Sequence, residues 1–209
     1  MDVEAVPAFF ATALIYAAVG FGGGSTYSAL LSLTGFDYAL LPIVSLACNV
    51  VVVSGSTIRF ARAGVIPWKR ALLLSGIAAP LAFLGGLTPI REAAFLALLG
   101  LSLVASGLAL FLPRAPEAEA QPAPAARHMA FVAAPLGYLA GLVGIGGGIF
   151  LAPLLHLTRW AGARQIAATA SLFILINSLA GLTGQLAKNG VERFGEALSG
   201  ALPLLIAVV

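Results

Sequence analysis

Charged residues are scarce in this chain of 209 residues: 11 are Lys or Arg, 8 are Asp or Glu, and 60% of the chain is hydrophobic. A soluble domain carries about a quarter charged residues, so these few charges cannot cover a water-exposed surface. The shortage argues against a soluble enzyme, a nucleic-acid-binding protein and a disordered chain, and it favours a polytopic membrane protein. The net charge of +3 then reports membrane orientation.

Cysteine and catalytic residue clusters are also missing. Cys48 is the only cysteine, which excludes an intrachain disulfide and a cysteine-based metal cluster. No Ser-His-Asp set, carboxylate pair or histidine cluster with metal-ligand spacing is present, so we expect no enzymatic activity and no cofactor. The long apolar runs contain no carboxylate, which argues against proton coupling through a buried acid.

Long runs without charge are what the sequence has instead. A bilayer core of about 30 Å needs about 20 apolar residues as a helix, and helix is the spanning form that these runs favour. The pattern therefore predicts an all-α membrane protein in which most of the runs can cross. The charge-free runs are Pro7–Phe36, Tyr38–Ile58, Ala71–Ile90, Ala93–Pro113, Met129–Thr158, Gln165–Ala187 and Ala197–Val209.

The chain divides into two halves that resemble each other. Residues 1–113 form the first, 129–209 the second, and the Pro- and Ala-rich residues 114–128 read as a linker. Val19–Thr34 and Val143–Thr158 share nine of 16 positions, including an aligned glycine triplet. Duplicated halves are common in transporters. The second half is one run short, so we expect a further span in the intact protein.

Each half carries a glycine triplet that favours a break in its helix. Glycine costs about 1 kcal/mol against alanine inside a helix, so Gly22–Gly24 and Gly146–Gly148 each oppose a continuous helix by about 3 kcal/mol. Unwound backbone at membrane depth must be buried in protein or line a wet cavity. The helix that restarts after a break presents free N–H groups that favour an anion. The alternative is that these glycines serve close helix packing.

Polar residues near the triplets complete a candidate anion site. Asn49 and Asn177 lie inside apolar runs at comparable places in the two halves, where they either face the substrate or pair with neighbouring helices. The candidate substrate-binding residues are Gly22, Gly23, Gly24, Ser25, Thr26, Asn49, Gly146, Gly147, Gly148, Ser171 and Asn177.

Together these motifs resemble the sulfite exporter TauE/SafE family of membrane transporters. The resemblance rests on GFGGG and GIGGG in duplicate, Pro153 after the second, the run Ala167–Leu172 and the motif Asn177–Gly181. It implies transport of small sulfur-containing anions such as sulfite and organosulfonates, and no enzymatic activity. The first half has Ala29 at the position of Pro153, so the two half-sites need not be equivalent.

Membrane topology stays open at this stage. The basic loop with Arg59, Arg62, Lys69 and Arg70 is expected in the cytoplasm. If each glycine run crosses once, the halves are parallel; if each returns as a re-entrant hairpin, they are inverted. Either arrangement puts eight basic residues inside and three outside. We favour the hairpin, because inverted repeats bring two broken helices face to face.

The main functional hypothesis is a multi-pass transporter of a small anion in a bacterial or archaeal plasma membrane. Its expected partners are the anionic substrate and the lipid bilayer, without nucleic acid, and a homodimer is left open. The alternatives are a non-transporting membrane scaffold subunit and, least favoured, a membrane enzyme.

Overall fold

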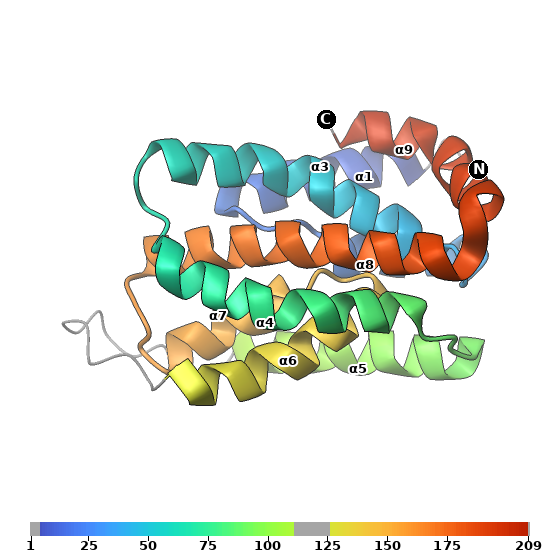
Figure 1. Ribbon diagram of the computed structural model, residues 1–209. Helices are drawn as coiled ribbons and strands as arrows, with labels where there is room; N and C mark the ends of the chain where they lie inside the picture. Colours follow the sequence, from blue (N-terminus) through green and yellow to red (C-terminus); the bar gives the residue numbers. More distant parts are fainter. Residues whose placement is uncertain (1–4, 111–125, 209) are drawn as a thin grey trace.

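The computed structural model describes residues 5–110 and 126–208, and every regular element in these ranges is an α-helix (Figure 1). The prediction of an all-α fold is therefore confirmed. The linker predicted at 114–128 falls mostly outside the described residues, so it stays a prediction, as does the division into two halves. The helices are α1 (Ala5–Val19), α2 (Gly24–Leu33), α3 (Leu41–Arg62), α4 (Trp68–Leu87), α5 (Glu92–Leu110), α6 (Ala126–Val143), α7 (Gly148–Leu157), α8 (Ala163–Gly200) and α9 (Leu202–Ala207).

Among the described residues, three helices are long and apolar enough to cross a membrane: α3, α4 and α8. Shorter apolar helices account for much of the remainder, because the two runs that contain the glycine triplets are each divided into two helices. α8 consists of two helical parts that meet at a kink at Gly190, where φ is 77°, shortly after the end of its charge-free run.

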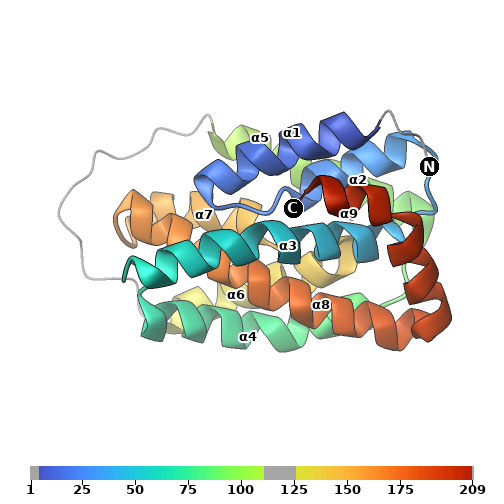
Figure 2. The ribbon, with the colours of Figure 1, turned by 90° about the horizontal axis from the view of Figure 1, so that it is seen from above.

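The chain reverses direction at both glycine segments. In Figure 2, α1 and α2 form two antiparallel arms, and in Figure 1 α7 returns along the direction from which α6 came. Matching contacts accompany the reversal: a Cβ on Gly23 would lie against Thr12 and Tyr16, and one on Gly147 against Leu136 and Ala140. The hairpin is thus the shape of each segment, while its re-entry into lipid and the internal repeat stay predictions.

Helices α4, α6 and α8 pack with their backbones in close approach. A Cβ on Gly137 or Gly141 of α6 would overlap the carbonyl groups of Ala78 or Ala82 in α4. Gly184 of α8 stands equally close to the backbone of α4. Small residues permit such approach, which supplies the van der Waals contact that holds membrane helices together. Close helix packing, which was the alternative role for the triplets, is thus provided in large part by glycines outside them, such as Gly137, Gly141 and Gly184.

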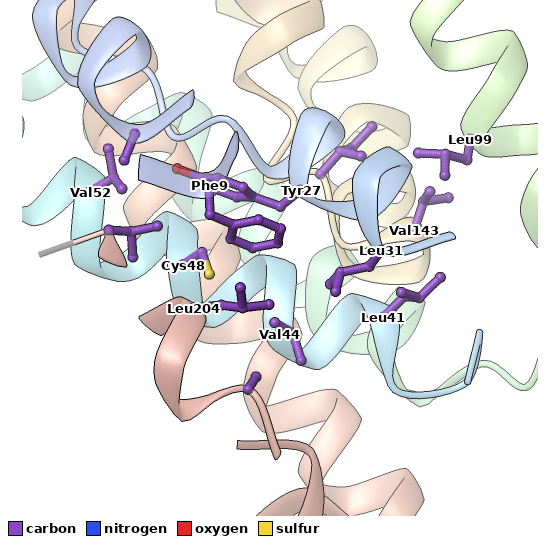
Figure 3. Close-up of a cluster of buried hydrophobic side chains, with 14 of the residues drawn as sticks. Phe9, Tyr27, Leu31, Leu41, Val44, Cys48, Val52, Leu99, Val143 and Leu204 are labelled. Atoms are coloured by element: carbon purple, nitrogen blue, oxygen red, sulfur yellow. The ribbon is translucent and has the colours of Figure 1, made fainter. Parts of the chain in front are cut away.

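A second packing region joins α1, α2, α3 and α9 around an aromatic pair (Figure 3). The rings of Phe9 and Tyr27 stack with their centroids 4.8 Å apart. Leu31, Cys48 and Leu204 are buried around them. This cluster fixes the first hairpin against α3, and it places Cys48 as a small apolar side chain in a packed interior.

The two ends of the molecule are defined by the turns that meet there. At one end the α3–α4 turn adjoins the α7–α8 turn, because the guanidinium of Arg70 lies 5.8 Å from the ring centre of Trp160. Arg59, near the end of α3, donates a hydrogen bond of 3.0 Å to the carbonyl of Ala17 in the last turn of α1. At the other end the segments near Tyr38, Ile90 and Lys188 line one pocket.

Candidate functional site

The first glycine segment ends in a helix N-terminus that points its N–H groups inward. Gly23 caps α2 with φ 74°, a left-handed conformation that glycine adopts without a steric penalty. The N–H groups of Thr26 and Tyr27 donate to the Gly23 carbonyl at 2.9 and 3.0 Å. Those of Gly24 and Ser25, at the start of the helix, have no intrahelical acceptor. Both residues are buried, so these donors face protein interior.

The second glycine segment repeats this local geometry. Gly147 caps α7 with φ 77°, and the N–H groups of Phe150 and Leu151 both donate to its carbonyl at 3.2 Å. The N–H groups of Gly148 and Ile149 are again without an intrahelical acceptor. The helix breaks predicted from the triplets are therefore present, and each one creates a start of helix at which the dipole favours negative charge.

The amide of Asn49 lies where the two glycine segments meet. A Cβ on Gly22 or Gly24 would overlap this amide, and one on Gly146 would stand 2.8 Å from its Nδ2 atom. Asn49 is 0% exposed, and neither its Oδ1 nor its Nδ2 forms a hydrogen bond. Glycine at these three positions is what leaves room for the amide. Sequence reasoning selected all four residues, and the structure brings them together.

Two residues of α8 also lie next to the glycines of the junction. The Cγ2 atom of Ile174 would lie 3.2 Å from a Cβ on Gly22 and 2.9 Å from one on Gly146. The Ser178 hydroxyl, also unpaired and buried, would lie 3.2 Å from a Cβ on Gly146. Neither was among the selected site residues. An isoleucine in an apolar run gives no sequence signal, whereas Ser178 directly follows the selected Asn177.

The remaining selected residues occupy different surroundings. Thr26 exchanges a hydrogen bond of 3.0 Å with the Tyr16 hydroxyl, which ties α2 to α1. Ser171 pairs with Thr57 at 3.0 Å, a buried link between α8 and α3. Asn177 is 0% exposed with both amide atoms unpaired, one position before Ser178. A substrate role for these three residues stays a prediction.

In the described part of the chain, none of the side chains nearest to the junction glycines is charged. Its side-chain donors and acceptors are the amide of Asn49 and the hydroxyl of Ser178, next to the two helix N-termini. Within residues 5–110 and 126–208, no group of three or more His, Cys, Asp or Glu side chains is placed to hold a metal ion. A neutral set of backbone and amide donors suits a small anion better than a cation, which would need carboxylates.

Comparison with known proteins gives two matches over most of the chain. The profile of the family described as Sulfite exporter TauE/SafE matches residues 5–209. A curated relative from Sinorhizobium fredii (strain NBRC 101917 / NGR234), named "Probable membrane transporter protein y4hK", is 35% identical over 211 residues, which cover 93% of this chain and 82% of the relative. No solved structure matches.

Proposed function

The chain belongs to the sulfite exporter TauE/SafE family and is a multi-pass membrane transporter, and on this premise we propose that it carries a small sulfur oxyanion, either sulfite or an organosulfonate. The substrate binds at the junction of the two glycine segments. The observation that carries the proposal is the unpaired, fully buried amide of Asn49 held between Gly22, Gly24 and Gly146.

The chemistry of the junction suits such an anion. The N–H groups of Gly24 and Ser25 and the Nδ2 group of Asn49 donate hydrogen bonds to the anion's oxygens, with the dipole of α2 adding favourable potential. The Oδ1 atom of Asn49 accepts a hydrogen bond, which the O–H group of hydrogen sulfite can donate, so hydrogen sulfite satisfies both ends of the amide. The second helix start, at Gly148, faces the same junction through its contact with Ile174.

The absence of a charged partner at the junction favours turnover. A buried lysine or arginine would hold the anion tightly, whereas a transporter must also release it. Backbone N–H donors on two separate hairpins can move away from the anion without breaking an ion pair. We propose that movement of one hairpin relative to the other exposes the junction to the two sides of the membrane in turn.

Sulfite and methanesulfonate flux in proteoliposomes tests this function. Asn49→Ala removes the amide and leaves a small apolar side chain, and we expect flux to fall at least about tenfold, the effect of losing one hydrogen bond to a charged group. Ser75→Ala is the matched control, because the Ser75 hydroxyl is also buried and unpaired but belongs to α4. Wild-type flux in the Asn49→Ala variant, at equal amounts of inserted protein, would contradict the proposed site.

No observation favours the alternative of a non-transporting scaffold, because the family and the relative are both transporters.

A further inference from the structure

A pocket of about 210 Å³ opens at the end of the molecule opposite the Arg70–Trp160 contact. It forms where the start of α3, the α4–α5 connection and α8 just before its kink come together. Its walls include Pro42, Ile90 and Leu142, and its polar side chains are Tyr38, Lys188 and Asn189. Asn49 and the glycine triplets are not among its lining residues, so it is separate from the junction.

The pocket contains one positively charged side chain among polar and apolar lining residues. Among the described residues that line it, Lys188 is the only charged one and none is acidic. Lys188 is half-buried, whereas Asp37 and Glu92, the nearest carboxylates in sequence to the other lining segments, are exposed. The carboxylate of Asp37 accepts a hydrogen bond of 3.0 Å from the N–H of Ala39. An ammonium group without a carboxylate partner in the same pocket attracts an anion.

The pocket is joined to the second glycine segment by packing and by hydrogen bonds. A Cβ on Gly144 would lie 2.5 Å from the Cα of Pro42, so the wall of the pocket rests directly on this segment. The Asn189 side chain donates to the Gln185 side chain at 3.1 Å, and Gln185 donates to the Gly141 carbonyl at 3.3 Å. Gln185 is fully buried. The contacts of the pocket thus continue inward to the helix that ends at the second break.

We propose that this pocket is a second anion-binding site, in which the Lys188 ammonium and the Asn189 and Tyr38 side chains hold a sulfonate or sulfite group before it enters, or after it leaves, the glycine junction. The identity of the anion rests on the proposed function. A water molecule occupies about 30 Å³ in the liquid, so the pocket has room for a small oxyanion with part of its water. The positive-inside rule places this end on the non-cytoplasmic side, because the densest basic loop lies at the other end.

Transport kinetics test whether Lys188 binds the anion in this pocket or acts only through its contribution to the overall positive charge. Lys188→Gln is expected to raise the KM for sulfite about tenfold with less than a twofold change in kcat, and Lys188→Arg to keep the KM within about threefold. Arg193→Gln is the matched control, because it removes a positive charge from the same helix at an exposed position that does not line the pocket. An unchanged KM in Lys188→Gln, or an equal rise in Arg193→Gln, would overturn the proposal.

A second measurement does not depend on transport. The sequence holds two lysines, Lys69 and Lys188, and Lys69 is exposed at the opposite end of the molecule. Acetylation of both lysines in the purified full-length chain is followed by mass spectrometry, with methanesulfonate as the probe and the uncharged dimethyl sulfone at the same concentration as its control. Ionic strength is held constant with sodium chloride. We expect methanesulfonate to slow acetylation of Lys188 at least threefold and to leave Lys69 unchanged.

The two experiments distinguish failure of the second site from failure of the proposed function. Equal protection of both lysines, or protection of neither, overturns the second site even if Asn49→Ala abolishes flux. Selective protection of Lys188 in a protein that moves neither sulfite nor methanesulfonate supports the pocket and refutes the proposed substrate.

Discussion

The Asn49 amide lies next to both glycine segments in the structure. A buried polar group without a hydrogen-bond partner costs about 1–3 kcal/mol, and this amide leaves both of its polar atoms unpaired. The amide fits because three neighbouring positions are glycine: a Cβ on Gly22, Gly24 or Gly146 would come too close to it. A substrate that forms hydrogen bonds with the amide removes this free-energy penalty when it binds.

The steric relation between Gly24 and Asn49 can be tested by paired substitution. Gly24→Ala places a methyl group on the Asn49 amide, and overpacking of this kind costs about 1–3 kcal/mol. We expect lower thermal stability and reduced sulfite flux in the single variant. Combining it with Asn49→Ala should restore stability but not flux, because the donor is gone.

Gly100→Ala in α5 is the control, since a Cβ there would meet no atom within 4 Å. Its stability should equal or exceed that of the wild type, because alanine favours helix. A Gly24→Ala variant as stable as Gly100→Ala would show that the amide does not occupy this space.

Sequence reasoning found the glycine triplets and Asn49 because three consecutive glycines and a buried amide are unusual inside apolar runs. It missed Ile174, whose contact with both glycine segments depends on how α8 is rotated, and periodicity in a uniformly apolar helix does not reveal rotation. It selected Ser171 without foreseeing its hydrogen bond to Thr57, because a pairing between distant segments has no local signal.

At the scale of elements, the two hairpins depend on left-handed glycines at Gly23 and Gly147. A residue with a Cβ loses about 1–2 kcal/mol in this conformation. We expect Gly23→Ala to lower stability and to reduce sulfite flux, because the start of α2 shifts away from the junction. Denaturation of the purified protein and flux in proteoliposomes measure the two effects.

Gly35 provides the comparison for that prediction. Its φ of 71° matches the 74° of Gly23, but a Cβ on Gly35 would meet nothing within 4 Å, whereas one on Gly23 would lie 3.1 Å from Thr12. Gly35→Ala therefore carries the backbone cost alone, and its flux should stay near that of the wild type. Equal loss of flux in both variants would contradict a specific role for the first hairpin.

Close approach of α4 and α6 gives a second prediction for elements. Gly141→Val inserts a branched side chain where the backbone of α4 already lies in contact, so we expect the two helices to separate and the folded protein to be lost. Gly107→Val in α5, where a Cβ would meet nothing within 4 Å, should fold normally. The fraction of monodisperse protein after size-exclusion chromatography distinguishes the two, and equal fractions would contradict tight α4–α6 packing.

Helix boundaries were predictable wherever charge ended a run. The run Tyr38–Ile58 closes at Arg59 in the sequence, and α3 ends close by at Arg62. α8 extends past Ala187 to Gly200 only as a second helical part, because Gly190, with φ 77° and ψ 166°, leaves the helical conformation and kinks the chain. A single glycine in sequence does not distinguish a kink from a turn.

At the scale of the whole molecule, the charge rule could not decide between a single crossing and a hairpin at each glycine segment, and the hairpin was favoured because inverted repeats bring two broken helices face to face. Basic residues gave the same count for parallel and inverted halves, so the charge rule had no discriminating power. The arms of both hairpins run antiparallel in the structure (Figures 1 and 2). Tyr38 and Lys188 consequently line one pocket at the same end.

Accessibility of introduced cysteines tests this arrangement in a membrane. Asp37→Cys and Glu192→Cys should both react with an impermeant thiol reagent added to intact cells, and Ala63→Cys should react only after permeabilisation, because all three positions are exposed and Ala63 lies at the other end. The native Cys48 is buried, so the unsubstituted protein serves as the blank. If Glu192→Cys, like Ala63→Cys, reacted only after permeabilisation, the two halves would be parallel.

The central claim is that an anion binds where the two glycine hairpins meet, and its most direct test is an experimental structure in lipid with selenite, a heavier analogue of sulfite that can be located by anomalous scattering. The account predicts a selenium peak beside Asn49, within hydrogen-bonding reach of the start of α2. Selenite that inhibits sulfite transport but gives its peaks only away from Gly22–Gly24 and Gly146–Gly148 would contradict it.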